Sequence, residues 1–458
     1  MTLSSPGDTG GSSPRGSAVT VDLSVARKAL AGIGVPVRDG SAADAVFGMT
    51  PPMVASPTSV SECAALLRAA AEHGLSVVPR GGGSRLGWGD PVTRCDLLVD
   101  MRRMDAVVEH AAGDLVARVQ AGARMGDVAD ALARAGQEIA LDVPSSATVG
   151  GVIGSALAGP RRLRYGSPRD LLIGVTIVRA DGTLAHSGGK VVKNVAGYDL
   201  GKLFAGSQGT LGLIAEATFR LHPLPAARAF VTSSHESDRD ASRAVAAAAA
   251  SPLVASAIEL RRRVPGGPIQ VGVLLEGSAD GVAARASRMT ELLGSDAVAA
   301  PEPPEWWPGV KRAPGGGTLI QVSFWVSALD SVLSVVDAAA GEHSVAPAVG
   351  GSAGAGVVYV GLGPATDAGV AGRFVGTLRE RLSHARGGVL VLTAPSPVRA
   401  ALDDYGGMTG PVPSLRLMRA VRDQFDPDHR MSPGRFPSEV RRGDAEGLSP
   451  RGSTAERA

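Results

Sequence analysis

The sequence of 458 residues predicts an α+β protein with two folded domains. Three observations lead to this prediction. Apolar residues at helical spacing alternate with short strand-like runs from residue 21 onwards. The prolines at 223 and 225 interrupt this pattern, so we expect a boundary near residue 225. Beyond it, strands and helices joined by short loops predict a mostly antiparallel sheet with helices packed on it.

The two ends differ in composition from the rest of the chain. Residues 1–20 and 437–458 are rich in Ser, Gly and Pro or charged residues and contain no long apolar run. We expect disordered tails there, and no secretory signal. The first domain is therefore predicted over residues 21–225 and the second over residues 226–436.

A β-α-β unit is the clearest pattern of the first domain. Residues 22–46 carry apolar residues at helical spacing and precede it. After Met53–Val54, the stretch SPTSVSECAALLRAAAEHG predicts a helix capped by Ser or Thr. LSVVPR, residues 75–80, predicts the next strand, and three consecutive glycines close the unit.

Further elements of the first domain follow from period-2 and helical patterns. A hairpin is expected over residues 171–189, with Asp181–Gly182 as its turn. The other expected elements are a strand in 97–104, a strand and a helix in 115–138, and a strand in 209–221.

The second domain shows four strand-like runs with helical stretches between them. The strands are expected within 271–278, 319–327, 357–363 and 389–395, and the helices within 281–294 and 371–387. The loop from Glu302 to Gly317 holds Trp306 and Trp307. An exposed pair there would be a lid or a docking point for a partner. Alternatively, both rings fill a gap in the core.

Two glycine-rich stretches indicate a bound ligand. PRGGGSRLGWGD, residues 79–90, places three glycines between two arginines, and PSSATVGGVIGS, residues 144–155, places glycines among small hydroxyl residues. Glycine lets the backbone approach a ligand closely, and amides of such bends can form an anion-binding nest. With Arg80 nearby, the two stretches predict a site for the diphosphate of a large cofactor. For the triglycine segment alone, an ordinary flexible loop is the alternative.

These stretches resemble the FAD-binding domain of the vanillyl-alcohol-oxidase/PCMH superfamily. RYGSPRDLLIGVTIVRADG, KNVAGYDLGKLFAGSQGTLGLIAEATFRLHPLP and the closing RAVRDQFDPDHRMSPGRF (Arg419 to Phe436) extend the resemblance over roughly residues 50–436. It is strongest to the 2-hydroxy-acid branch, meaning D-lactate dehydrogenases and the FAD-binding subunit of glycolate oxidase. The resemblance implies a PCMH-type FAD-binding domain of two subdomains, followed by a cap domain that holds the substrate.

The resemblance also implies non-covalent FAD, because Ser84 stands where relatives with a tethered flavin carry a histidine. The residues expected to bind this cofactor are Arg80, Gly81, Gly82, Gly83, Ser84, Pro144, Thr148, Gly150, Gly151, Gly154, Ser155, Tyr165, Gly166, Asp170, Asn194, Gly209, Thr210 and Ile214.

Oxidation of a 2-hydroxy acid, glycolate or D-lactate, is the reaction that the resemblance implies. A hydride moves from the carbinol carbon to the flavin, a base takes the hydroxyl proton, and an Arg or Lys holds the carboxylate. The catalytic candidates are Lys193 and Tyr198, with Lys190 and Asn194 beside them, and Arg312 for the carboxylate. Alternatively, these side chains only brace their loops.

Composition excludes several other functions. A net charge of +2 gives no electrostatic footprint for nucleic acid. Two cysteines, Cys63 and Cys95, are too few for an iron–sulfur cluster and fit a reducing, cytoplasmic location. The histidines of the second domain lack metal-pair spacing, so no metal site is expected. No GxGxxG motif for NAD and no membrane span are visible.

The lack of paired histidines is also a feature of the glycolate oxidase FAD-binding subunit. That subunit works beside a second flavin subunit and an iron–sulfur subunit, so the resemblance implies similar partners here. Two alternatives stay open: a catalytically silent subunit that carries a flavin for electron relay, and a flavin oxidase of sugars or alcohols.

Overall fold

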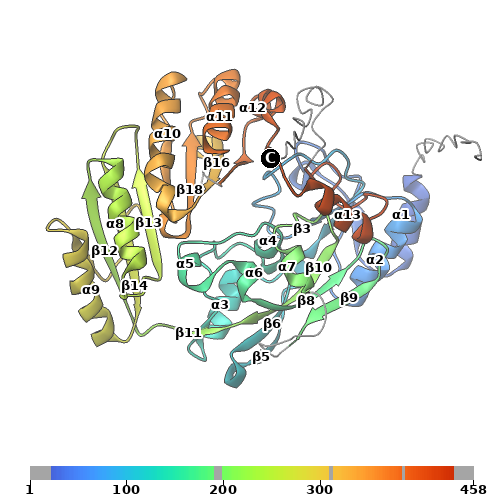
Figure 1. The fold of residues 1–458 in the computed structure, drawn as a ribbon. Helices are drawn as coiled ribbons and strands as arrows, with labels where there is room; N and C mark the ends of the chain where they lie inside the picture. Colours follow the sequence, from blue (N-terminus) through green and yellow to red (C-terminus); the bar gives the residue numbers. More distant parts are fainter. Residues whose placement is uncertain (1–21, 190–198, 309–312, 384–386, 438–458) are drawn as a thin grey trace, which may run out of the picture.

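The computed structural model describes residues 22–189, 199–308, 313–383 and 387–437. Its strands form sheets of four, five, two and eight members. Figure 1 shows the eight-stranded sheet with its helices on one side of the molecule and the smaller sheets on the other. Helices and mainly antiparallel sheets are thus mixed, and the predicted α+β class is confirmed.

The four-stranded sheet contains the predicted β-α-β unit. Its strands lie in the spatial order β1 (Val37–Asp39), β2 (Met53–Ala55), β4 (Leu97–Asp100) and β3 (Val77–Arg80). Both β2 and β3 run parallel to β4, which lies between them. The connecting helix α2 (Val60–Glu72) begins at Ser59, whose hydroxyl accepts a hydrogen bond from the Glu62 N–H at 3.2 Å.

The helix expected within residues 22–46 is shorter than the apolar pattern. Helix α1 (Leu23–Gly32) ends because Gly34 adopts φ +82° and Pro36 follows it. Strand β1 and a short 3-10 turn, η1 (Ala42–Asp44), occupy the remainder, so the extended helical reading of this segment was wrong.

The five-stranded sheet is antiparallel throughout and includes the predicted hairpin. Its strands are β5 (Val107–Ala111), β6 (Val116–Gln120), β10 (Leu213–Arg220), β8 (Leu172–Val178) and β9 (Leu184–Gly188). The hairpin of β8 and β9 turns at Asp181–Gly182, where Gly182 adopts φ +81°. Five helices accompany the sheet: α3 (Met125–Ala133), α4 (Val149–Gly154), α5 (Arg162–Tyr165), α6 (Pro168–Leu171) and α7 (Leu200–Phe204).

The eight-stranded sheet consists of two halves that have the same order of strands and helices. Its spatial order is β15 (Val298–Ala300), β12 (Ala227–His235), β14 (Ile269–Gly277), β13 (Ala257–Arg262), β17 (Ala348–Gly351), β18 (Val357–Leu362), β16 (Thr318–Ser323) and β19 (Gly388–Thr393). With helices α8 (Asp238–Ala250), α9 (Ala279–Leu293), α10 (Leu329–Glu342) and α11 (Ala368–Leu382), each half follows a β-α-β-β-α-β path. The halves meet where β13 pairs antiparallel with β17.

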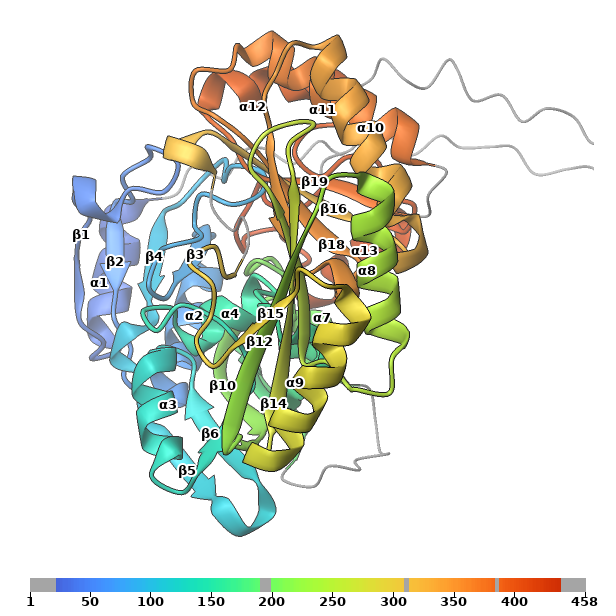
Figure 2. The ribbon, with the colours of Figure 1, turned by 90° about the vertical axis from the view of Figure 1, so that its left-hand side faces the viewer.

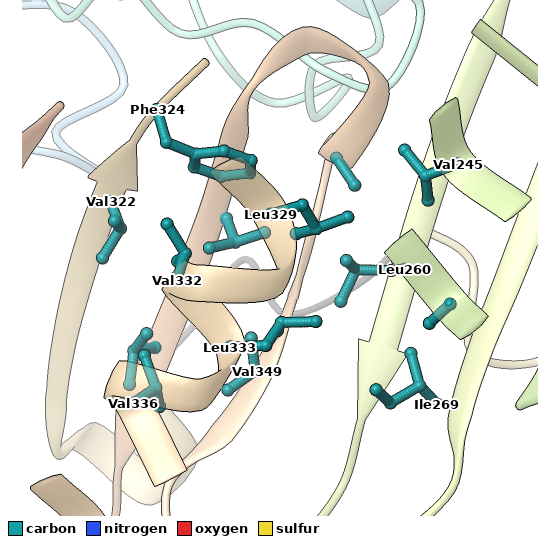
Figure 3. Close-up of a cluster of buried hydrophobic side chains, with 14 of the residues drawn as sticks. Val245, Leu260, Ile269, Val322, Phe324, Leu329, Val332, Leu333, Val336 and Val349 are labelled. Atoms are coloured by element: carbon teal, nitrogen blue, oxygen red, sulfur yellow. The ribbon is translucent and has the colours of Figure 1, made fainter. Parts of the chain in front are cut away.

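These four helices cover one face of the eight-stranded sheet, and the main core lies between them (Figure 2). Figure 3 shows this core, where Leu333 of α10 lies between side chains of β16 and β13, among them Val322 and Leu260. Full burial of each such side chain contributes about 1.5–3 kcal/mol. Packing of the four helices on one face thus stabilises the sheet, and other segments of the chain contact the opposite face.

The tryptophan pair covers part of that other face. The Trp307 ring meets the Phe230 ring edge-on, with centroids 5.2 Å apart. Trp306 lies against Gly272 of β14, where an added Cβ would be 2.8 Å from the indole. Both rings are half-buried, and these contacts fit the gap-filling alternative.

The predicted boundary near residue 225 falls between two sheets. Strand β11 (His222–Pro223) pairs with β7 (Gln137–Glu138), and β12 begins at Ala227 in the eight-stranded sheet. The division into domains at this point stays a prediction. Two further helices, α12 (Ser396–Leu402) and α13 (Leu415–Phe425), follow the last strand. None of the described helices is long and apolar enough to cross a membrane.

Replacing Arg262 should destabilise the eight-stranded half. This arginine is 1 % exposed, and its guanidinium nitrogens lie 2.7 Å from carboxylate oxygens of Asp238 and Asp337. Arg262→Met leaves both carboxylates without their cation, and we expect the free energy of unfolding to fall by about 3 kcal/mol in a urea titration. Arg243→Met is the control, because among the described residues Arg243 pairs only with the exposed Asp240. This variant should change stability by less than about 1 kcal/mol. Equal stability of the two variants would contradict this role of Arg262.

Candidate cofactor-binding site

A pocket with eight glycines in its wall lies between the four-stranded and five-stranded sheets. Its walls come from the loop after β3, the end of β6, helix α4 with the turn before it, the start of β10, and Arg435. Gly81 and Ala147 both line this pocket, although they are 66 residues apart in the sequence. The fold therefore brings the two glycine-rich stretches together, as the sequence predicted.

The triglycine loop passes so close to Thr148 that no side chain fits at Gly81. A Cβ on Gly81 would lie 2.0 Å from Thr148 Oγ1, and one on Gly82 would lie 3.0 Å from the Ser146 carbonyl oxygen. Gly83 adopts φ +76°, which strains any other residue. The glycines thus have a steric reason, which the flexible-loop alternative lacks.

Gly150 and Gly209 serve packing within the protein. An added Cβ on Gly150 would lie 3.0 Å from the Ala121 Cβ, and the Gly150 N–H donates to the Ala121 carbonyl at 2.7 Å. Gly209 adopts φ +77° and lies against Pro79. The absence of a side chain at these two positions therefore lets α4 and the turn before β10 approach the neighbouring segments. Both glycines also line the pocket.

One hydroxyl of the pocket wall has no partner. Thr148 is 2 % exposed, and its Oγ1 makes no hydrogen bond within the part of the chain that the structure describes. A buried hydroxyl without a partner costs about 1–3 kcal/mol. A ligand oxygen in the pocket would remove this cost.

Arg80 lines the pocket, but its charge is compensated within the protein. Its Nη2 lies 2.9 Å from Asp44 Oδ1 and 2.8 Å from Asp100 Oδ2, and all three side chains are buried. Hydrogen bonds from Arg38 lower the pKa of Asp44 far below its usual range. Burial raises the pKa of Asp100, but hydrogen bonds from Arg102 and Arg80 outweigh it, so the net shift is downward. Arg80 therefore fixes the start of the triglycine loop.

Arg435 is a second buried cation at the pocket, and the sequence analysis missed it. It is 7 % exposed and donates to the carbonyls of Leu86 and, at 3.3 Å, Trp88. Among the described residues it forms no ion pair with a carboxylate. Burial lowers its pKa to about 10, so it remains charged at neutral pH. It can supply the positive charge that Arg80 does not.

The structure brings twelve of the predicted cofactor-binding residues to the pocket wall. They are Arg80, Gly81, Gly82, Gly83, Ser84, Thr148, Gly150, Gly151, Gly154, Ser155, Gly209 and Ile214. The wall also contains residues that were not predicted, namely Pro79, Arg85, Leu86, Trp88, Met101, Ala121, Ala147, Gln208, Gly212, Leu213 and Arg435. The loop after the triglycine is the largest omission.

Five predicted residues lie outside the pocket wall and serve local structure. The Asp170 carboxylate accepts hydrogen bonds from Ser167 at 2.7 and 2.8 Å, which caps α6, and Gly166 makes the preceding turn at φ +83°. Thr210 Oγ1 donates to the Ser207 carbonyl at 2.7 Å, and the Pro144 carbonyl accepts from the Ala147 N–H at 2.9 Å.

Tyr165, the fifth, faces the eight-stranded sheet. Its hydroxyl lies 3.4 Å from Glu276 Oε2, and its ring lies 4.7 Å from that of His222. The remaining predicted residues, Lys190, Lys193, Asn194, Tyr198 and Arg312, lie outside the described residues.

The pocket wall reaches the helix-free face of the eight-stranded sheet through Trp88. Trp88, in the pocket wall, packs on an apolar cluster of that face, which contains Leu319, Val357, Tyr359 and Leu392. The guanidinium of Arg85 lies 5.0 Å from the Trp88 ring centroid. The glycine-lined end and the sheet-facing end of the pocket therefore differ in chemistry.

Cysteine and metal chemistry add nothing to this pocket. Cys63 and Cys95 are buried free thiols, and burial raises the pKa of each to about 12. Within the described ranges, no cluster of three or more His, Cys, Asp or Glu side chains could hold a metal ion. The two thiols are therefore core residues.

Comparison with known proteins agrees with this geometry. Residues 51–188 match the FAD binding domain family. The chain is 35 % identical over 212 residues to glycolate oxidase subunit GlcD of Bacillus subtilis, which is 46 % of this chain and 45 % of the relative. It is 36 % identical over 192 residues to a D-lactate dehydrogenase of Archaeoglobus fulgidus, which is 39 % and 42 %. It is 38 % identical over 154 residues to glycolate oxidase subunit GlcE of Escherichia coli, which is 33 % and 43 %.

These matches span less than half the length of each relative. Similarity of fold extends further: the glucooligosaccharide oxidase of Acremonium strictum superimposes with a TM-score of 0.65 over 91 % of this chain and 99 % of its own, at 14 % identity. Residues 51–188 thus match an FAD binding domain, and the chain is similar to FAD-linked oxidoreductases that include a glycolate oxidase subunit and a D-lactate dehydrogenase.

Proposed function

We propose that this protein oxidises a small 2-hydroxy acid, glycolate or D-lactate, with non-covalently bound FAD. The observation that carries the proposal is the glycine-lined pocket, whose wall holds the Thr148 hydroxyl, unpartnered among the described residues, and reaches the eight-stranded sheet through Trp88. The names of the relatives supply the substrate class. In this proposal residues 21–225 bind the cofactor, and residues 226–436 form the cap over it.

The pocket residues fit a diphosphate in three ways. The backbone of Gly81 and Gly82 lines the pocket, the Thr148 hydroxyl can donate to a phosphate oxygen, and Arg435 carries a positive charge without an ion pair to a carboxylate among the described residues. Ser84 follows the glycines and has no side-chain nitrogen to form a covalent link. These residues would hold FAD without a tether.

At the sheet-facing end, the protein would exclude water and orient the substrate. Bound FAD would supply the hydride acceptor. The apolar cluster against Trp88 removes water from this end, which strengthens every polar contact there. We propose Lys193 and Tyr198 as proton acceptors and Arg312 as a carboxylate ligand, with Asn194 toward the cofactor.

We further propose that the chain works as the FAD-binding subunit of a glycolate oxidase-like complex in the cytoplasm. Two of the relatives are named as subunits of glycolate oxidase. Electrons would pass from this chain to a second flavin subunit or an iron–sulfur subunit. Two cysteines cannot ligate a cluster, so any iron–sulfur centre lies on a partner.

A methyl group at Gly81 should prevent cofactor binding. In Gly81→Ala, the new Cβ meets Thr148 Oγ1 at 2.0 Å, so the loop must move away from the pocket. We expect the purified variant to contain less than about one-tenth of the FAD per chain found in the wild type, measured by absorbance after denaturation. Gly87→Ala, in the same loop but with open space at its Cβ, should retain the cofactor. Full FAD content in Gly81→Ala would show that the cradle is wrongly assigned.

Substrate should bleach the flavin absorbance of the purified protein. Under anaerobic conditions, glycolate or D-lactate should remove the yellow colour, whereas glucose or a simple alcohol should not. Acid precipitation should leave the yellow colour in the supernatant if FAD is non-covalent. Bleaching by sugars would instead favour a sugar oxidase. An unchanged spectrum with every 2-hydroxy acid, alone and with the partner subunits, would favour an electron-relay subunit.

A further inference from the structure

Two consecutive arginines at the base of the eight-stranded sheet have opposite electrostatic surroundings. Arg161 is surrounded by three carboxylates: Glu138 at 2.6 Å, Asp142 at 2.7 Å and Glu276 at 3.3 Å. Burial lowers the pKa of Arg161, but these three carboxylates outweigh it and raise the pKa above its ordinary value. Arg161 is a structural cation that joins the two halves of the chain.

Arg162, the next residue, forms no ion pair with a carboxylate among the described residues. Its guanidinium donates to the carbonyls of Ala158 at 2.7 Å and Gly159 at 3.3 Å. Its third contact is the hydroxyl of Tyr359, 3.4 Å from Nη2. Two carbonyls and a hydroxyl hold the fork of this half-buried arginine in place without neutralising its charge. Such an arginine is ready to bind an anion.

Tyr359 adds a proton donor beside this charge. It lies on β18, is 7 % exposed, and belongs to the apolar cluster on which Trp88 packs. Burial raises the pKa of Tyr359, so its hydroxyl stays protonated at neutral pH. The oxygen accepts from Arg162, and within the described part of the chain its own proton has no acceptor. An arginine fork and a phenol proton side by side fit a carboxylate.

This pair lies just beyond the pocket wall, to which Trp88 connects it. Trp88 and Arg85 line the pocket, and Trp88 contacts the cluster that contains Tyr359. Arg85 also acts electrostatically on the Tyr359 hydroxyl, in the same direction as Arg162. Glu259 of β13 opposes them and accepts a hydrogen bond from Ser352 at 2.5 Å.

We infer that Arg162 and Tyr359 bind the carboxylate of the substrate. This inference rests on the proposed function and deepens it, because it assigns the anionic end of a small 2-hydroxy acid to described residues outside both predicted catalytic segments. The carboxylate accepts hydrogen bonds from the Arg162 guanidinium and from the adjacent Tyr359 hydroxyl, and the carbinol carbon faces the pocket, where bound FAD would accept the hydride. A substrate without a carboxylate lacks this anchor.

Oxalate binding tests the inference without requiring turnover. Oxalate carries the carboxylate but has no carbinol hydrogen, so it should perturb the flavin absorbance of the FAD-loaded chain and give a dissociation constant. Arg162→Gln should raise that constant roughly 10- to 100-fold, as expected for the loss of a charge-assisted hydrogen bond. Arg162→Lys keeps the positive charge but lacks the planar guanidinium, so its oxalate dissociation constant should lie between those of the wild type and Arg162→Gln. Arg164→Gln, an exposed neighbour on the same short helix, is the matched control and should bind oxalate like the wild type.

Tyr359→Phe removes only the hydroxyl and keeps the packing of its ring. It should raise the oxalate constant several-fold with normal FAD content, and it carries the test if Arg162→Gln fails to fold. Wild-type affinity in Arg162→Gln and Tyr359→Phe, or no oxalate binding by the wild type, overturns the inference. Oxalate binding that depends on Arg162, combined with no reduction by glycolate or D-lactate, supports the anion site and refutes only the proposed reaction.

Discussion

The close approach of Gly81 to Thr148 is the contact on which the rest of the site depends. It joins the end of a parallel strand in one sheet to the turn that starts α4 on another sheet, at a distance that leaves no room for a Cβ. Because both segments contribute backbone at this point, the pocket has one wall from each sheet. The cofactor cradle is therefore a property of how the two sheets are docked, and neither stretch forms it alone.

The C-terminal end of the described chain supports the strand that precedes the triglycine loop. Residues around Met431 run beside β3: the Val77 N–H donates to the Arg430 carbonyl at 2.9 Å, and the Ser432 N–H donates to the Val77 carbonyl at 2.8 Å. Asp426 is buried and accepts hydrogen bonds from the backbone of Arg430 and Met431. The segment thus adds backbone pairing to the strand that carries the triglycine loop, which explains why a stretch so late in the sequence lines the pocket.

The sequence predicted those elements that are determined by neighbouring residues in the chain, such as a helix cap or a tight turn. Helix α2 follows from the Ser59 cap and its apolar spacing, and the hairpin turn follows from Asp181–Gly182. The duplicated path of the eight-stranded sheet could not be predicted, because its two halves share a topology without a repeated motif. Strand β1 has only three residues, too few for a period-2 pattern to be visible.

The same distinction applies to the site. Thr148 could be predicted because its hydroxyl adjoins the glycines that open the pocket. Arg435 could not, since it meets the Leu86 carbonyl across a separation of 349 residues. Arg80 was predicted as a phosphate ligand because it precedes the triglycine in the sequence. In the structure it forms ion pairs with Asp44 and Asp100, which lie in other segments and compensate its charge. Contacts between distant segments decide what each charged residue does.

Arginine partners distinguish structural from ligand-binding roles in this protein. Arg262 and Arg161 are neutralised by carboxylates, and Arg379 is saturated differently, with its guanidinium donating to four backbone carbonyls. Among the described residues, the guanidinium of Arg162 is neither paired with a carboxylate nor fully bonded to backbone carbonyls. One of its three contacts is the phenol oxygen of Tyr359, the weakest acceptor among these partners. A guanidinium offers five N–H donors, and a half-buried one retains unused donors only where water or an anion can complete them. Beside the apolar cluster on which Trp88 packs, a small carboxylate can complete those donors and accept the Tyr359 proton at the same time.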